Sequence, residues 1–149
     1  MKKTFFTLVL LAVFTQAMVF AQSNADRELA KAHYQRGEYY RDRGNWDTAI
    51  AEYTEAIRLN PNIYNYYADR AFSYFYKGDY DHVIADFTQA IRLNPPNEDK
   101  SAFYLGCATA YFLKGNFTQA RADVNSALQI NPSYQEAKDV DAALKQRGY

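Results

Sequence analysis

Cysteine is nearly absent from this chain of 149 residues, which contains only Cys107. A single cysteine cannot form a disulfide bond within the chain, so the fold must be stable through packing. Histidine is almost as rare, and neither His33 nor His82 has Cys, Asp or Glu at the spacing of a metal site. The sequence also lacks a glycine-rich phosphate-binding loop. We therefore predict that the protein is not an enzyme and uses no metal and no cofactor.

Neither sign of charge is in excess, because 17 Lys and Arg face 17 Asp and Glu. A nucleic-acid-binding module normally carries a concentrated basic surface. The balance therefore argues against a nucleic-acid partner and against electrostatic docking on anionic lipid. The carboxylates of Asp86 and Asp123, which lie in second helices, are interpreted as solvated positions and not as an acid-base pair.

Long apolar runs are missing except at the N-terminus, where residues 5–14 follow Lys2 and Lys3. This arrangement is typical of a bacterial signal peptide, and small residues precede a cleavage site after Ala21. Gln16 leaves the run shorter than a membrane-spanning helix prefers. We therefore expect residues 1–21 to be removed and the protein to be periplasmic or secreted. The alternative is an uncleaved anchor in the inner membrane.

No segment alternates with a period of two, but a longer unit recurs three times. Glycines stand at 44, 78 and 115, which are 34 and 37 residues apart, and an Asn-Pro pair ends each unit at 61, 95 and 132. Glycine supplies the left-handed conformation that ends a helix, and the residue before proline avoids the helical conformation. Each unit is therefore predicted to be two helices joined by a tight turn, and the chain is predicted to be all-α.

The positions of small and aromatic residues within each unit are also repeated. Small residues occupy three places in almost every unit: Gly37, Ala71 and Ala108; Ala49, Val83 and Ala120; Ala56, Ala90 and Ala127. Aromatic residues recur at two more, which are Tyr40, Tyr74 and Tyr111, and Tyr53 and Phe87 with Val124 in the third unit. Small residues let helices approach closely, while large ones fill the space between them.

This pattern resembles the tetratricopeptide repeat. The resemblance implies a right-handed superhelical array of helix-turn-helix repeats, with three repeats and a C-terminal capping helix. The expected divisions are a signal peptide at 1–21, a lead-in at 22–29, repeats at 30–63, 64–97 and 101–134, a linker insertion at 98–100, and a capping helix at 135–149.

In arrays of this family the first helix of each repeat lines a concave surface that binds proteins or peptides. The residues expected to contact the partner here are Tyr34, Glu38, Arg41, Asn65, Phe72, Tyr76, Leu105, Thr109 and Phe112. This surface changes from charged at one end to aromatic and apolar at the other, which suits an extended segment or an amphipathic helix. The lysine and asparagine clamp with which one subclass holds C-terminal carboxylates is missing, because its places hold Tyr34 and Glu38.

Two alternatives to partner binding remain open from the sequence. The apolar residues of the concave face can instead be partly buried between neighbouring helices. The same face can also bury a second copy of the chain, which would make the protein a structural homo-oligomer.

Overall fold

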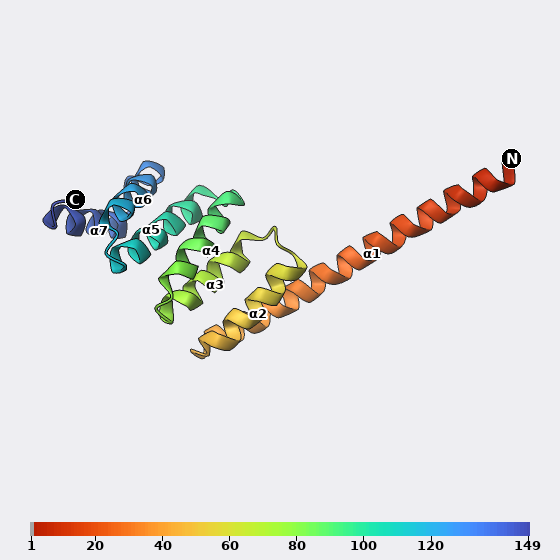
Figure 1. Ribbon diagram of the computed structural model, residues 1–149, viewed down its shortest axis with the longest axis horizontal. Helices are drawn as coiled ribbons and strands as arrows, with labels where there is room; N and C mark the ends of the chain where they lie inside the picture. The colour runs from red at the N-terminus through yellow and green to blue at the C-terminus, as the bar shows by residue number, and fades with distance from the viewer. Residues whose placement is uncertain (1) are drawn as a thin grey trace.

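The computed structural model describes the backbone of residues 2–149 and the side chains of residues 22–149. Over this part of the chain it contains seven helices and no strand, as predicted. The helices are α1 (Lys2–Arg41), α2 (Trp46–Leu59), α3 (Tyr64–Tyr76), α4 (Tyr80–Arg92), α5 (Asn97–Leu113), α6 (Phe117–Ile130) and α7 (Gln135–Gln146). Each helix packs on the next in sequence, and α2 to α7 form one row with the C-terminus at its end (Figure 1). The predicted array is thereby confirmed.

The turn inside each repeat is built the same way three times. The glycines at 44, 78 and 115 have φ angles of 71°, 75° and 77°, in the left-handed region that favours glycine. The residue after each glycine caps the second helix, since the side chains of Asn45, Asp79 and Asn116 accept hydrogen bonds from the backbone of Thr48, His82 and Gln119. One short motif therefore ends one helix and starts the next.

The repeated small residues lie where helices approach most closely. The three alanines at 56, 90 and 127 are completely buried, as are Ala49, Val83 and Ala120. Tyr53 and Phe87 fill the adjoining space and are also buried. A methyl group on Gly37 would lie 2.5 Å from Tyr53 Cε1, so only glycine fits there. The repeated small residues therefore mark the close helix contacts, and the repeated aromatic residues fill the space beside them.

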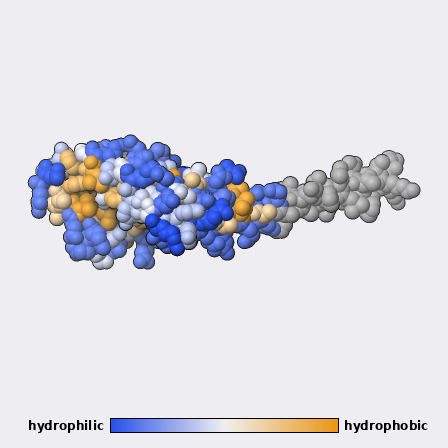
Figure 2. All heavy atoms as spheres, turned by 90° about the horizontal axis from the view of Figure 1, so that it is seen from below, coloured by the Kyte–Doolittle hydropathy of each residue, from blue (hydrophilic) through white to orange (hydrophobic). Residues whose placement is uncertain are grey.

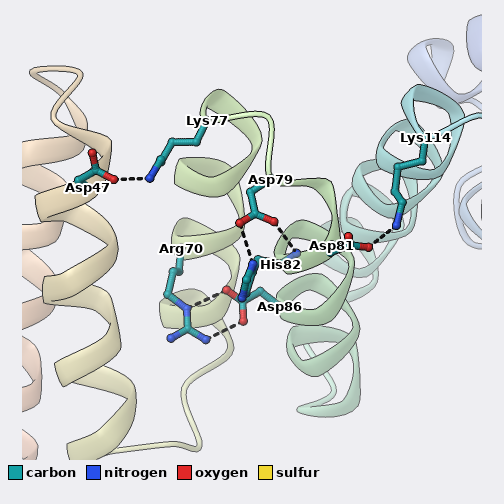
Figure 3. Close-up of polar contacts among 8 residues, drawn as sticks. All are labelled: Asp47, Arg70, Lys77, Asp79, Asp81, His82, Asp86 and Lys114. Carbon is teal, nitrogen blue, oxygen red and sulfur yellow. Dashed lines mark hydrogen bonds and ion pairs between the residues drawn. The ribbon is translucent and has the colours of Figure 1, made fainter.

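Exposed ion pairs join consecutive repeats along the edge that carries the turns. Lys77, which ends α3, donates to Asp47 at the start of α2, and Lys114 donates to Asp81 in the same way one repeat later (Figure 3). The two pairs occupy equivalent places, so the junction between repeats is itself repeated.

Two parts of the chain differ from expectation. Residues 98–100, which we expected in a linker, form the first turn of α5, where the acidic side chains of Glu98 and Asp99 suit a helix N-terminus. The lead-in at 22–29 is helical and continues α1. The insertion therefore lengthens a helix and does not form a loop.

The expected signal peptide at 1–21 lies outside the residues whose side chains are described. Within the described part of the chain, no helix has the length and apolar character needed to cross a membrane.

Candidate binding groove

Three adjoining hollows form one continuous groove along the first helices of the repeats. The first hollow, of about 390 Å³, lies between Arg41, Asp69 and Tyr76. The second, of about 270 Å³, shares Phe72 and Tyr76 with the first. The third, of about 380 Å³, shares Thr109 with the second. Because neighbouring hollows share residues, a single extended ligand can contact all three.

The first hollow is charged and is built around a partly buried carboxylate, that of Asp69. Asp69 accepts a hydrogen bond of 2.6 Å from the Tyr34 hydroxyl and one of 2.7 Å from Arg41 Nη1. Burial raises the pKa of Asp69, although both of these hydrogen bonds act to lower it. Arg41 also donates to Asp42, which is exposed. The Arg41 guanidinium is therefore already held by two carboxylates of the protein itself.

Exposed aromatic rings line the central hollow. Phe72 is 46% exposed and packs edge-on against Phe87, with ring centroids 5.3 Å apart. Tyr76 is 66% exposed and stacks on Trp46. A methyl group on Gly106 would lie 2.5 Å from the Phe87 ring, so the absence of a side chain keeps this ring in place under the hollow. Both rings are therefore packed against other aromatic rings while remaining open to solvent, so they can serve as anchors for a ligand.

The third hollow lies between α5 and α7 and is almost wholly apolar. Leu113 is half exposed there, and Phe112 packs edge-on against Phe117. Val140 and Ala143 of α7 form the opposite wall. On the face drawn in Figure 2, apolar surface gathers over the end of the array that carries the C-terminus. The groove therefore changes from charged to apolar along its length, as the sequence predicted.

The structure brings six of the nine expected contact residues into this groove, and they are Arg41, Phe72, Tyr76, Leu105, Thr109 and Phe112. The other three line none of the hollows. Tyr34 is half buried under Asp69, while Glu38 is half buried and Asn65 is exposed. Tyr34 therefore supports the groove without facing it.

Several residues that line the groove were not among the expected contacts, and they include Trp46, Asp69, Tyr134 and Val140. Trp46 begins a second helix, and Tyr134 and Val140 belong to the capping segment. The expectation rested on first helices alone, so it missed all three. Trp46 is the only tryptophan in the chain, and no recurring position in the repeats marked it as a groove residue.

Cys107 and both histidines, which lie outside the groove, are packed against or paired with other residues of the protein. Cys107 is buried, and burial raises the pKa of its thiol to about 12. His33 lies 2.7 Å from Glu52, and His82 stacks on Tyr74. Among the residues with described side chains, no three His, Cys, Asp or Glu lie close enough together to hold a metal.

One interpretation from the sequence is wrong: Asp86 is not solvated. It is buried and receives two hydrogen bonds from Arg70, which is bound to it through both carboxylate oxygens (Figure 3). The two residues are 16 positions apart on different helices, so no local pattern revealed the pair.

The tetratricopeptide-repeat family model matches residues 30–63 and 64–97. The tetratricopeptide-repeat domain of Arabidopsis OM64 is 25% identical to this chain, with a TM-score of 0.74 over 82% of this chain and 98% of that one. The second such domain of human RPAP3, in complex with an HSP70 peptide, is 24% identical, with a TM-score of 0.71 over 83% of this chain and 98% of that one.

The TPR2B domain of yeast Sti1, in complex with pHsp70, is 22% identical, with a TM-score of 0.71 over 80% of this chain and 98% of that one. No curated protein matches the sequence of this chain. The first two repeats therefore belong to the tetratricopeptide repeat family, and the array as a whole has the tetratricopeptide-repeat fold.

Proposed function

We propose that the protein is an exported scaffold that binds a segment of another protein in its concave groove. The observation that carries this proposal is the continuous groove with Phe72 and Tyr76 exposed on its floor. Large exposed aromatic residues in a hollow are the usual anchors of protein interfaces. Several proteins with the same fold bind peptides, including the human RPAP3 and yeast Sti1 domains.

The charges of the groove indicate which peptides it prefers. Arg41 is neutralised by Asp69 and Asp42, and Asp139 lines the apolar hollow at the other end. The groove therefore presents more negative than positive charge. The preferred ligand is a neutral or basic segment with apolar anchors, as an extended strand or an amphipathic helix. Acidic C-terminal peptides are disfavoured because the places that would clamp their carboxylates hold Tyr34 and Glu38.

The test is isothermal titration calorimetry with two sets of synthetic peptides. Both sets carry the same leucine and phenylalanine anchors, and they differ only in whether the flanking residues are lysine or glutamate. Phe72→Ala should weaken binding of the lysine set by about 2 kcal/mol, as truncation of a buried anchor does. Tyr39→Ala is the matched control, because Tyr39 is equally exposed on α1 and lines none of the hollows.

Equal binding by wild type and folded Phe72→Ala would contradict a role for the groove. A homodimer in light scattering that Phe72→Ala converts to a monomer would support the structural homo-oligomer instead. The two outcomes are distinguishable because only the second depends on protein concentration without any added peptide.

Export is a separate part of the proposal. It rests on the apolar run at 5–14 behind Lys2 and Lys3. The intact mass of the protein recovered from the periplasm of a bacterial host should correspond to residues 22–149. A mass that retains residues 1–21 in a membrane fraction would instead indicate an anchored protein.

A further inference from the structure

The guanidinium of Arg70, in the second repeat, is enclosed by side chains of the same protein. Arg70 donates 2.8 Å and 2.7 Å hydrogen bonds to the two carboxylate oxygens of Asp86 (Figure 3). It also donates a 3.0 Å hydrogen bond to Thr54 Oγ1. Its guanidinium also lies 5.9 Å from the ring centre of Tyr67 and 6.0 Å from that of Tyr74. A planar cation is thus held by one carboxylate, one hydroxyl and two aromatic rings.

The third repeat keeps all four of these partners at the equivalent places. Asp123 corresponds to Asp86 and Thr88 to Thr54, while Tyr104 and Tyr111 correspond to Tyr67 and Tyr74. The place of Arg70 is taken by Cys107, whose side chain is much shorter. The space that the arginine would occupy is a cavity of about 320 Å³, lined by these same residues.

We propose that this cavity in the third repeat is a binding site for an arginine side chain of another polypeptide. The partner's guanidinium would take the position that Arg70 holds one repeat earlier, paired with Asp123 and placed between Tyr104 and Tyr111. The second repeat thus shows the same site occupied by an arginine, and this occupant indicates the kind of ligand that the cavity of the third repeat would take.

The charge of the cavity supports a cationic ligand. Among the residues with described side chains, no Lys or Arg lies within ion-pair distance of Asp123. Burial raises the pKa of this carboxyl to about 6, although a hydrogen bond from Gln119 acts to lower it. Arg92 is exposed at the rim of the cavity, and Gln119 is also exposed there. Asp123 is therefore a half-buried carboxylate that a bound cation would stabilise.

The cavity is separate from the groove. On α5, Tyr104, Cys107 and Tyr111 line the cavity, whereas Leu105 and Thr109 line the groove. At about 100° per residue, the two sets lie on opposite faces of this helix. The two sites share no residue, so an arginine bound in the cavity does not depend on the proposed function of the groove.

The probe is N-acetyl-arginine amide, added to the full chain at pH 7.5 and followed by NMR. Its neutral isostere, N-acetyl-citrulline amide, has the same shape without the charge. We expect saturable shifts of the Tyr104 and Tyr111 ring signals with the arginine probe, with a dissociation constant on the order of millimolar, and weaker binding by about tenfold or more for citrulline.

Two variants test the site from opposite directions. Asp123→Asn should weaken binding of the arginine probe by about tenfold or more, because it removes the charge and keeps the shape. Cys107→Arg should abolish binding and raise the melting temperature, since it returns an internal guanidinium to the cavity. Glu136→Gln is the matched control, because Glu136 is an exposed carboxylate that lines neither the groove nor the cavity, so the change should leave probe binding unchanged.

Saturable binding that Asp123→Asn removes and Glu136→Gln does not would support the proposal. Absence of binding to wild type, equal binding of citrulline, or unchanged binding in folded Asp123→Asn would overturn it. If Cys107→Arg fails to fold, the comparison between Asp123→Asn and Glu136→Gln still decides the outcome.

Discussion

The indole ring of Trp46 lies flat on the phenol ring of Tyr76, with ring centroids 4.4 Å apart and an angle of 7° between the planes. Trp46 begins α2 in the first repeat and Tyr76 ends α3 in the second, so the stack crosses a repeat junction inside the groove. Since Trp46 is the only tryptophan, its fluorescence reports on this one place.

Tyr76→Ala should therefore move the emission maximum of Trp46 to longer wavelength, because the indole loses its cover and contacts water. The loss of one aromatic pair should lower the free energy of unfolding by about 1 kcal/mol. Steady-state fluorescence and urea unfolding measure both effects. Tyr39→Ala, which removes an exposed ring that does not stack on the indole, should leave the emission unchanged.

Ala90→Trp should be severely destabilising, because Ala90 is completely buried where α4 meets its neighbours. Overpacking a close helix contact costs about 1–3 kcal/mol and sometimes more. Ala85→Trp on the same helix is the control, since Ala85 is exposed. Thermal unfolding by circular dichroism compares the two, and similar melting temperatures would mean that the assigned packing is wrong.

Arg70→Ala and Arg36→Ala should differ, although both residues occupy the same place in their repeats. The side chains of Arg70 and Asp86 are only 17% and 8% exposed, so removing the arginine leaves an uncompensated buried charge and should cost about 3 kcal/mol or more. The Arg36 side chain is 52% exposed, and its pair with Glu52 should be worth about 1 kcal/mol or less. Urea unfolding of both variants gives the comparison, and equal losses would contradict it.

Tyr53→Phe should leave the stability unchanged or raise it by up to about 1 kcal/mol. Tyr53 is completely buried, and its hydroxyl is the one buried side-chain oxygen without a hydrogen-bond partner among the described side chains. Tyr34→Phe is the contrasting variant, since it removes the hydrogen bond to Asp69 and should destabilise the protein. A clear loss of stability in Tyr53→Phe would show that its hydroxyl has a partner.

Asp123 should make stability depend on pH. Burial raises the pKa of its carboxyl to about 6 in the folded chain, compared with about 3.9 in an unfolded one. The folded state therefore holds this proton more tightly, so the contribution is fully present below about pH 4 and is lost as the pH rises through about 6. The other ionisable groups around the cavity are Arg92, Tyr104, Cys107 and Tyr111.

Asp123→Asn has no titrating group at this position. The melting temperature of the variant minus that of the wild type should therefore increase as the pH is raised from 4 to 7. Every other ionisable group is common to both proteins and cancels in the difference. A difference that stays constant across this range would contradict the raised pKa.

The fold was predictable because its determinants are local and periodic. Gly44, Gly78 and Gly115 end helices by their own conformation, and the buried alanines mark the close contacts at a fixed distance along the chain. Residues 98–100 were assigned wrongly because the three extra residues of the 37-residue interval were placed in the linker between repeats. Pro96 instead caps α5, and the residues after it are good first-turn residues.

The site was less predictable because it depends on contacts between distant residues. Tyr34 was expected to face the partner, but Asp69, which lies 35 positions away, holds its hydroxyl inside the array. Tyr134 lines the groove only because the capping segment folds back beside α5. Such placements follow from the stacking angle between repeats, and no single repeat encodes that angle.

The ion pair between Lys77 and Asp47 joins the first two repeats, and the pair between Lys114 and Asp81 joins the second and third. At both joints, the forces at the turn edge differ from those in the interior. Along the turn edge the joint is held by solvent-exposed charges, whose attraction dissolved salt screens. The interior of the same joint is held by apolar packing, which salt does not screen. Each of these joints is therefore held by apolar packing in the core and by ion pairs along one edge. We therefore expect raised ionic strength to weaken the turn edge of these joints before it affects their packed interior.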